Sequence, residues 1–434
     1  MIRLIYNLLF PFAALFFLPG ALRKMRRRGE YRQNFAQRFG IYAPEVRARL
    51  AHGRRTWIHA VSVGEVVVAL KLIKKLRALD PQIHCVLTTT TTTGFAVAQK
   101  EASAALEVMY NPLDFWPVVR RAFAVIRPER IVLVEAEVWP NLAAGARARR
   151  IPLALVNARL SARSEGRFLR FRAVVAQTFR CLDLVGVQDM EDVDRWARLG
   201  VARERIRNVG SIKYDSAEDE AKERAAIPAE ALNSLGIDST KLVLLGGSTH
   251  AGEEEILAEV FLRLRQEFPA LLLVIAPRHV ERTAGVQMVL AARGLTVALR
   301  SEAQPAPGAD CLLLDTTGEL RDWYAIATVV FVGKSLTAHG GQNPVEPILA
   351  GKPVIVGPFM ENFASLSRSL VAHEAIIRVA DADALAARAA ELLRDPDAGQ
   401  RLVKNATAVL ARHCGATART AELLLSLDSH VARR

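Results

Sequence analysis

Short apolar runs that alternate with longer amphipathic stretches are the feature that most constrains how this chain folds. A buried strand needs only a few consecutive apolar residues, whereas a helix packed on a sheet needs a longer segment with one apolar face. When such strand–helix units follow one another, their strands pair in parallel and their helices cover the sheet. The sequence therefore predicts an α/β protein built on doubly wound parallel sheets.

The apolar runs form two series, and a chain of 434 residues is long enough for two cores. The first series comprises residues 57–61, 83–88, 106–110, 130–135, 151–157 and 184–187, and the second comprises residues 241–246, 271–276, 295–299, 311–315, 329–333, 353–357 and 376–379. Residues 214–240 are polar and carry no strand pattern, so we interpret them as an interdomain connection with some helix. Two Rossmann-like domains facing a cleft are expected, residues 33–213 and residues 241–434, the second with a helical tail.

The net charge and the cysteine content indicate what kind of partner the protein binds and what kind of compartment it occupies. The formal net charge of +13 implies an anionic partner, without saying whether it is a nucleic acid, a membrane surface or a phosphorylated small molecule. The four cysteines lie far apart and form no C-x-x-C pair. A reducing compartment fits this pattern, and a zinc site or a disulfide framework does not.

The N-terminus, residues 2–22, reads IRLIYNLLFPFAALFFLPGAL and is mostly apolar. At ~1.5 Å per residue, a helix of this length just reaches across a bilayer core of ~30 Å. A cluster of basic residues, 23–32, comes after the apolar run, whereas a signal peptide carries its charge in front. By the positive-inside rule, residues 1–32 are expected to anchor a cytoplasmic body to a membrane. A buried core helix is the alternative, and whether the segment spans the bilayer or lies in its interface stays open.

Glu65 lies in the motif HAVSVGEV, residues 59–66, where a strand-like stretch gives way to a helix-like one, residues 66–79. A carboxylate in the first turn of a helix is stabilised by the free N–H groups and the helix dipole. Ligands of parallel sheets, however, bind beyond the carboxyl ends of the strands. Glu65 is therefore either a helix-start residue or a functional carboxylate.

The motif GGSTHAGEEE, residues 246–255, follows a predicted strand and opens a predicted helix. The backbone N–H groups of Gly247, Ser248 and Thr249 could there bind a phosphate. A helix-capping turn without a ligand is the alternative.

The motif APRHVER, residues 276–282, ends another predicted strand and exposes Arg278 and His279. A guanidinium group suits bidentate recognition of a phosphate. A solvated turn is the alternative interpretation.

The motif GKSLTAHGGQNPVEP, residues 333–347, is the most specific of these stretches. Its two glycines, Gly340 and Gly341, would let a ligand approach the backbone closely. Asn343 can cap a helix, and the carboxylate of Glu346 then lies where it could hold two ribose hydroxyls. Helix-start chemistry explains Asn343 but not the double glycine, so a ligand site is predicted here.

Taken together, these motifs resemble the 3-deoxy-D-manno-octulosonic acid (Kdo) transferases of lipopolysaccharide synthesis. The resemblance covers nearly the whole chain and rests on eight motifs in order: HAVSVGEV (59–66), VEAEVWPN (134–141), NARLS (157–161), GSIKYD (210–215), STHAGEE (248–254), PRHVER (277–282), DTTGEL (315–320) and GGQNPVEP (340–347). Members of this family are glycosyltransferases with the GT-B fold, and that fold is the expectation here.

The resemblance implies a CMP-Kdo donor, a lipid A precursor (lipid IVA) as acceptor, inversion at the anomeric carbon and no metal or cofactor. It also implies that the first domain binds the acceptor, the second binds the CMP-sugar, and the inner membrane holds the anchor. By residue, Glu65 resembles the catalytic base, and the CMP site is matched by Arg278, His279, Asn343 and Glu346. On chemical grounds, the N–H groups near Ser248 and Thr249 are expected to stabilise the departing phosphate, with Lys213 as a further cation.

Two positions depart from the family pattern. Gln342 stands where the family commonly has a histidine, and Thr93-Gly94 is followed by Phe95 and Ala96, whereas the family often has a glutamate after this Thr-Gly, as in TGSE. Two rivals also remain: an enzyme of the same fold that uses a UDP-sugar, and a membrane-attached nucleic-acid-binding protein. The second rival predicts basic residues interleaved with aromatic ones on the body, whereas the densest basic cluster here adjoins the apolar N-terminus.

Overall fold

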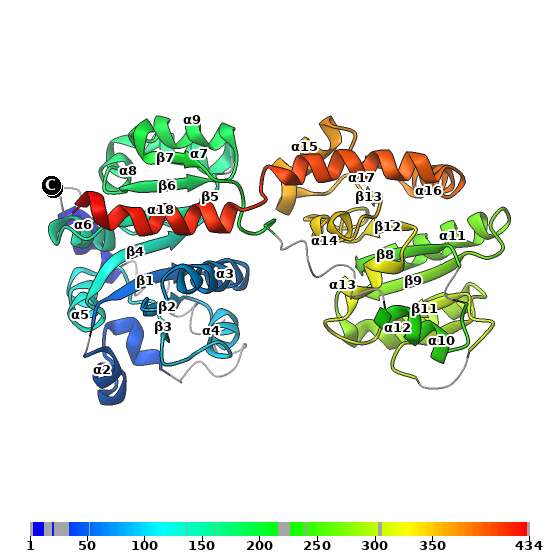
Figure 1. Ribbon diagram of the computed structural model, residues 1–434, viewed down its shortest axis with the longest axis horizontal. Helices are drawn as coiled ribbons and strands as arrows, with labels where there is room; N and C mark the ends of the chain where they lie inside the picture. The colour runs from blue at the N-terminus through cyan, green and yellow to red at the C-terminus, as the bar shows by residue number, and fades with distance from the viewer. Residues whose placement is uncertain are drawn as a thin grey trace. The chain divides into compact units, whose positions relative to one another are not determined.

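The protein is described by a computed structural model that covers residues 3–12, 20, 34–51, 53–135, 137–160, 162–215, 226–238, 241–302 and 306–431. The chain forms two compact units (Figure 1). The first unit comprises Met1–Asp215 and His413–Arg434, and the second comprises Ser216–Arg412. Each unit is described by itself.

The first unit is a parallel sheet covered by helices. Its strands have the order β3-β2-β1-β4-β5-β6-β7. Every pair of neighbours is parallel. The strands are β1 (Arg55–Ala60), β2 (Cys85–Thr89), β3 (Leu106–Tyr110), β4 (Pro128–Val134), β5 (Leu153–Ala158), β6 (Leu184–Val187) and β7 (Ile206–Asn208). The helices are η1 (Phe35–Phe39), α2 (Pro44–Leu50), α3 (Val63–Leu79), α4 (Thr92–Gln99), α5 (Trp116–Ile126), α6 (Pro140–Ala148), α7 (Ala162–Arg170), α8 (Arg172–Phe179), α9 (Met190–Arg198), η2 (Arg203–Arg205) and α18 (Ala416–Val431).

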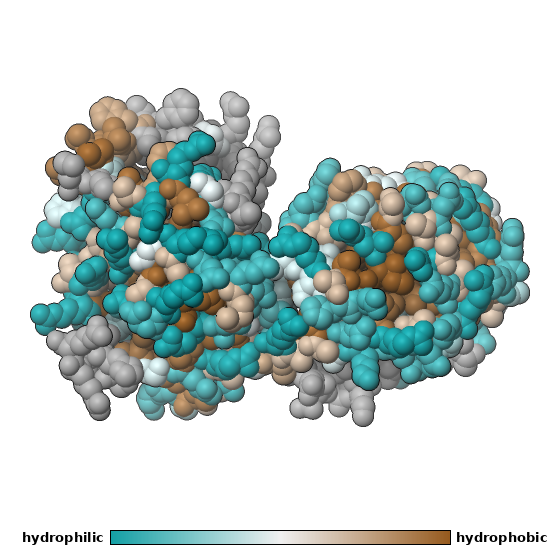
Figure 2. All heavy atoms as spheres, turned by 90° about the horizontal axis from the view of Figure 1, so that it is seen from above, coloured by the Kyte–Doolittle hydropathy of each residue, from teal (hydrophilic) through white to brown (hydrophobic). Residues whose placement is uncertain are grey.

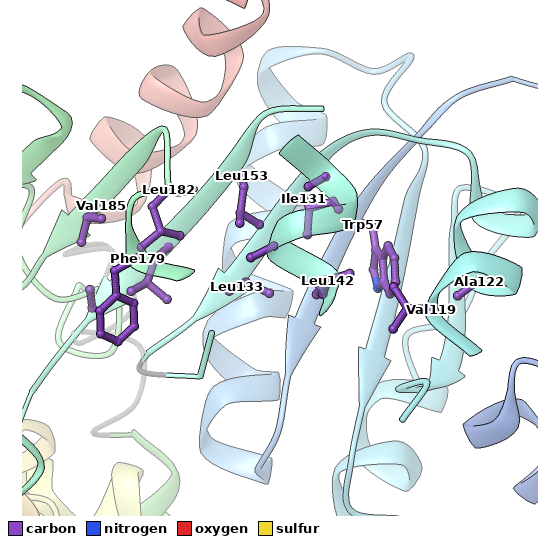
Figure 3. Packing of buried hydrophobic residues seen from close by; sticks show 14 of the residues in the cluster. Trp57, Val119, Ala122, Ile131, Leu133, Leu142, Leu153, Phe179, Leu182 and Val185 are labelled. Atoms are coloured by element: carbon purple, nitrogen blue, oxygen red, sulfur yellow. The ribbon is translucent and has the colours of Figure 1, made fainter. Parts of the chain in front are cut away.

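Alternate side chains of these strands fill two cores, one on each face of the sheet. Figure 3 shows the first, where Trp57 of β1 packs among residues of α5 and α6. The Trp57 ring meets Phe123 edge to face, with ring centroids 5.7 Å apart. The neighbouring residue, Ile58, faces the second core, beneath α3 and α4. This alternation explains why β1 is buried along its whole length.

The second unit repeats the architecture. Its parallel strands have the order β10-β11-β9-β8-β12-β13-β14. They are β8 (Val243–Thr249), β9 (Leu272–Pro277), β10 (Val297–Leu299), β11 (Cys311–Leu313), β12 (Val329–Val332), β13 (Val354–Val356) and β14 (Ile377–Arg378). The helices are α10 (Ala226–Ser234), α11 (Glu253–Arg265), η5 (Val280–Arg282), α12 (Thr283–Ala292), α13 (Leu320–Trp323), η6 (Tyr324–Ile326), α14 (Val345–Leu349), η7 (Glu361–Phe363), α15 (Ala364–Ala372), α16 (Ala382–Arg394) and α17 (Pro396–Ala411). The prediction of two doubly wound parallel sheets is confirmed.

The helical tail was assigned to the second domain, residues 241–434, and this assignment is wrong at its end. Helix α18, red in Figure 1, packs on the first unit. Its Ala421 and Leu424 are fully buried in the core beneath α3. Asp215 caps the start of the helix, because its carboxylate accepts hydrogen bonds from Gly415 N at 2.8 Å and Thr417 N at 2.7 Å. An apolar face and a cap therefore hold the tail on the first unit.

The connection predicted for residues 214–240 is also partly a domain element. Residues 216–225 and 239–240 lie outside the described residues. Helix α10 belongs to the second unit, where Leu232, Leu235 and Ile237 are buried. We interpret the segment as a connection because its sequence contains no strand pattern. The absence of a strand pattern does not exclude a helix that packs against the second unit.

The N-terminal residues 3–12 form a helix on the first unit. Asn7 Oδ1 accepts a hydrogen bond from Trp116 N at 3.0 Å, and Phe10 stacks on Phe115 at 5.3 Å. The basic stretch, residues 23–32, lies outside the described residues. No helix in the described part of the chain has both the length and the apolar character needed to cross a membrane. Residues 13–19, 21 and 22 of the predicted anchor also lie outside the described residues.

Candidate functional site

Both sheets have a point where the strand order changes direction, and the predicted site residues gather there. In the first sheet β1 lies between β2 and β4, and in the second sheet β8 lies between β9 and β12. Helices leave for opposite faces at such a point, so a crevice opens beyond the carboxyl ends of the strands. Glu65 follows β1, and residues 333–346 follow β12. Each unit thus carries one candidate half-site.

Glu65 is built into the start of α3. Ser62 is the N-cap of α3, and its Oγ accepts a hydrogen bond from Glu65 N at 3.4 Å. The carboxylate in turn accepts from Val61 N at 2.8 Å and from Ser62 Oγ at 2.9 Å, one bond on each oxygen. This exchange resembles a capping box and explains why α3 begins three residues before the predicted helix. Each oxygen keeps a second lone pair for a further donor.

The surroundings of Glu65 make its carboxyl group a base near neutral pH. Burial, as the largest cause, and the negative charges of Glu135 and Glu137 together raise the pKa of Glu65 to about 7, against the opposing hydrogen bonds from Val61 and Ser62. Burial also raises the pKa of Glu137. A carboxylate with a pKa near the working pH can accept a proton and give it up again.

Glu135 and Lys213 complete the half-site of the first unit. Glu135 has a left-handed backbone, φ 68°, at the end of β4. Such a conformation is costly for a residue with a side chain and is concentrated at functional sites. Burial lowers the pKa of Lys213, and the charge of Glu135 opposes that shift. Asn157 holds the Lys213 segment, because its Oδ1 accepts a hydrogen bond from Ile212 N at 3.0 Å. Lys213 therefore belongs to the unit that carries Glu65.

In the second unit, the glycines after Leu245 are part of a strand and do not form a phosphate loop. β8 continues to Thr249, three residues beyond the predicted end of that strand. A Cβ on Gly246 would lie 2.4 Å from Leu257, and one on Gly247 would lie 2.5 Å from the Tyr324 hydroxyl. Close packing inside the unit thus explains both glycines.

The start of α11 is occupied by the protein's own carboxylate. Glu253 is fully buried and accepts four backbone hydrogen bonds. His250 N and Lys334 N donate to Oε2 at 2.8 and 2.7 Å, and Ser335 N and Leu336 N donate to Oε1 at 2.9 and 3.0 Å. Glu253 therefore joins the loop after β8 to the loop after β12.

Ser248 and Thr249 differ in what they offer a ligand. Ser248 is half-buried and has a left-handed backbone, φ 55°. Thr249 is buried, and its hydroxyl donates to Glu254 Oε1 at 2.9 Å. Glu254 in turn pairs with Arg282 at 2.8 Å. The Thr249 hydroxyl is thus already hydrogen-bonded within the protein. The predicted binding of a phosphate by the Thr249 backbone N–H stays a prediction.

Arg278 and His279 lie where β9 ends, next to the loop after β8. Arg278 N donates to Thr249 O at 3.0 Å. Both side chains are exposed. The ring of His279 lies 6.0 Å from that of His250, measured between centroids. Within the described residues the Arg278 guanidinium has no acceptor, so it is available to an anion.

The loop after β12 has a structural reason for its double glycine. Gly340 and Gly341 have φ angles of 123° and 70°, and a Cβ on Gly341 would lie 2.4 Å from Met360 Sδ. Asn343 Oδ1 accepts a hydrogen bond from Val345 N at 3.1 Å, although the N-cap of α14 is Pro344 and not Asn343. Asn343 Nδ2 also donates to Glu346 Oε1 at 3.2 Å, which brings the amide and the carboxylate together.

Sequence reasoning missed three residues that the structure places in these half-sites. Glu135 and Glu137 lie in VEAEVWPN, which was noted as a motif without a role, and Glu253 lies in STHAGEE. Two carboxylates at the end of a predicted buried strand, residues 130–135, were the signal for the first pair. Phe95, the first of the two residues at the Phe95-Ala96 departure from the family pattern, stacks on Tyr110 with ring centroids 4.4 Å apart.

The sequence is similar to those of known proteins over most of its length. Residues 33–216 match a family model described as 3-deoxy-D-manno-octulosonic-acid transferase, and residues 309–409 match one described as glycosyl transferases group 1. A 3-deoxy-D-manno-octulosonic acid transferase of Haemophilus influenzae is 34% identical over 397 residues, 91% of each chain. One of Bordetella pertussis is 36% identical over 413 residues, 93% of this chain and 94% of the other.

Solved structures show the same fold at low identity. The UDP-GlcNAc 2-epimerase of Neisseria meningitidis bound to UDP-GlcNAc has a TM-score of 0.58 at 13% identity, over 86% of this chain and all of the other. A glycosyltransferase of Rickettsia africae has a TM-score of 0.56 at 10% identity, over 88% of this chain and all of the other. Two parallel-sheet α/β domains of GT-B type are thus a shared architecture.

Proposed function

The chain belongs to the 3-deoxy-D-manno-octulosonic acid (Kdo) transferases, glycosyltransferases of lipopolysaccharide synthesis, and from this premise we propose that it transfers Kdo from CMP-Kdo to the lipid A precursor lipid IVA. The observation that carries the proposal is the carboxylate of Glu65, which lies beyond the end of β1 with a pKa raised to about 7. A sugar hydroxyl is a poor nucleophile at neutral pH and needs a base within hydrogen-bond reach.

In the proposed reaction, Glu65 accepts the proton of the acceptor hydroxyl. The hydroxyl oxygen bonds to the anomeric carbon of Kdo while the bond from that carbon to the CMP phosphate oxygen breaks. Attack on the face opposite the leaving phosphate inverts the anomeric carbon. The hydrogen bonds from Val61 and Ser62 hold the carboxylate in one orientation, so little reorganisation is needed during proton transfer.

The second unit supplies the proposed donor site. Arg278 and the N–H groups near Ser248 and Thr249 would stabilise the charge of the departing CMP phosphate. Glu346, oriented by Asn343, would accept hydrogen bonds from the ribose hydroxyls. His279, Gly340 and Gly341 are proposed to border the same ligand, and no metal is required.

The N-terminal residues 1–32 are proposed to attach the protein to the cytoplasmic face of the inner membrane. This proposal is supported by exposed fractions of 75%, 69% and 70% for the side chains of Leu4, Leu8 and Phe12.

The donor separates this function from a UDP-sugar enzyme of the same fold. With lipid IVA present, the protein is expected to release CMP from CMP-Kdo and no UDP from UDP-GlcNAc. Nucleotide release is followed by chromatography with each donor in turn. Release of UDP without release of CMP would assign the chain to the rival class.

The pH dependence of kcat/KM is expected to follow the Glu65 carboxyl group. The pKa raised to about 7 means that the protonated, inactive form dominates below that pH, so log(kcat/KM) should rise with unit slope up to pH 7 and then level. Glu137→Gln removes a negative neighbour and should move the bend to lower pH. A bend unmoved in Glu137→Gln and lying near pH 4.5, the ordinary value for a glutamate, would exclude Glu65 as the base.

Donor affinity is expected to fall when the charged groups of the second unit are removed. Arg278→Ala should remove contacts with the CMP phosphate, and Glu346→Gln should remove contacts with the ribose. Each substitution is expected to weaken the free energy of CMP binding by about 1–3 kcal/mol. The matched controls are Arg293→Ala and Glu259→Gln, residues of the same unit whose side chains lie 3.8 Å apart, and both should leave the affinity unchanged. Calorimetry with CMP makes the measurement, and equal affinity in all four variants would place the donor elsewhere.

A further inference from the structure

A second hollow of the first unit is lined by arginines. Its cavity of about 650 Å³ lies where β5, β6 and β7 begin, with α18 as one wall. Its basic lining consists of Arg147, Arg150, Arg180, Arg205 and Arg207. All the strands of a parallel sheet begin at the same end of the sheet, and Glu65 lies beyond the other end, after β1. This hollow, which we call the arginine pocket, is therefore at the end of the sheet opposite Glu65. It therefore belongs to neither half-site described above.

The carboxylates of the arginine pocket do not neutralise it. Asp183 and Glu204 are the acidic residues of its lining. Asp183 is largely engaged by the backbone, because its Oδ2 accepts a hydrogen bond from Leu153 N at 3.0 Å. The nearest guanidinium nitrogen of Arg205 lies 3.9 Å from Asp183. The pocket thus keeps a positive excess.

Three of its guanidinium groups are unsatisfied by the protein. Over the described ranges, the side chains of Arg147, Arg150 and Arg180 form no ion pair and donate to no protein acceptor. Some other arginines of the unit do form ion pairs: Arg195, for example, lies 3.1 Å from Asp192. Guanidinium groups that converge without carboxylates bind phosphate well, because their fork geometry matches two phosphate oxygens.

The neighbouring surface is apolar. Leu184 and Leu423 line the arginine pocket itself. An adjoining cavity of about 950 Å³ shares Cys181 with it and is lined by Leu8, Trp116 and other apolar side chains. Trp116 and Leu8 are exposed by 52% and 69%. On the face of the protein that Figure 2 draws, apolar residues, in brown, lie at the surface among polar residues, in teal. A basic hollow beside an apolar one matches an amphiphile with a phosphate headgroup.

We propose that the arginine pocket binds the phosphate headgroup of an anionic lipid, with the acyl chain lying over the adjoining apolar cavity. Arg147, Arg150 and Arg180 contact the phosphate oxygens. The ligand differs from the acceptor, whose hydroxyl must reach Glu65 at the other edge of the sheet. The proposal stands apart from the transfer reaction and can be tested without a sugar donor.

The test is calorimetry of the full-length protein with dihexanoyl phosphatidic acid below its micelle concentration. The combined variant Arg147→Gln, Arg150→Gln, Arg180→Gln is expected to lose at least ten-fold in affinity. The control variant Arg47→Gln, Lys74→Gln, Arg77→Gln removes the same charge from exposed positions of the same unit. It should bind within two-fold of the unmodified protein. The melting temperature should be unchanged in both variants, which shows that each is folded.

Two further ligands identify the source of the phosphate. Dihexanoyl phosphatidylcholine, whose net charge is zero, and inorganic pyrophosphate, which has no acyl chain, should each bind at least ten-fold more weakly than the phosphatidic acid. Equal loss of affinity in the pocket and control variants, or no loss in either, overturns the site. Pyrophosphate binding as tightly as the lipid through the same arginines overturns the lipid and leaves a soluble phosphate compound as the ligand.

Discussion

Glu65→Gln is expected to lower turnover by roughly 10²- to 10⁴-fold, the usual contribution of general base catalysis, while leaving CMP-Kdo binding intact. An amide of the same size cannot take the acceptor's proton. It can still accept a hydrogen bond from Val61 N, and the cap of α3 survives because glutamine is an accepted partner in such boxes. The melting temperature should therefore stay the same or rise, since the variant no longer buries a charged group.

The control for this variant is Glu45→Gln, which changes an exposed carboxylate in the first turn of α2 in the same unit. Its turnover should stay within two-fold of the unmodified protein. Steady-state kinetics, donor titration and thermal melting are measured on both. A folded, donor-binding Glu65→Gln protein that keeps more than about a tenth of its turnover would leave Glu65 as a helix-start residue alone.

Glu253→Gln is expected to destabilise the second unit strongly, although the substitution changes one atom. One carboxylate oxygen becomes an NH₂ group, so two of the four backbone N–H groups around Glu253 lose their acceptor. Each buried donor left without a partner costs about 1–3 kcal/mol, and the sum is roughly 2–6 kcal/mol of unfolding free energy. Hydrogen exchange of peptides from β8 and β12, followed by mass spectrometry, measures the loss where it arises.

Glu259→Gln on the same helix provides the control, because the Glu259 side chain is 51% exposed and lies 3.8 Å from Arg293. Its exchange should match the unmodified protein. CMP affinity should fall in Glu253→Gln and hold in Glu259→Gln, since Glu253 joins the two loops of the proposed donor site. Identical exchange in the two variants would show that the four hydrogen bonds do not hold the loops.

The strands were predictable because each is a short buried run with a clear apolar pattern. β3 and β6 have the predicted bounds, residues 106–110 and 184–187. β7 was missed because Arg207 and Asn208 are exposed, so its three residues contain a single buried position. An amphipathic pattern indicates that a helix packs on a core, but it does not identify the core. The position of α18 on the first unit was therefore not predictable.

The candidate site was predictable as far as each motif carried its own local signal. The place of Glu65 after a strand follows from residues 56–66 alone. Its neighbour Glu135 depends on β4 lying beside β1, and that pairing of strands distant in sequence is a property of the sheet order. Likewise, the role of Glu253 was missed, since its partners Lys334, Ser335 and Leu336 come from a distant loop.

The central claim, that the chain transfers Kdo from CMP-Kdo to a lipid A precursor, is tested most directly by the mass of the product. Purified protein is incubated with CMP-Kdo and lipid IVA, and the lipid is extracted and weighed by mass spectrometry. The account predicts lipid IVA heavier by one or more Kdo residues, with CMP released in equal amount and neither change in the Glu65→Gln variant. Unmodified lipid IVA after incubation with a folded, CMP-binding protein would contradict it.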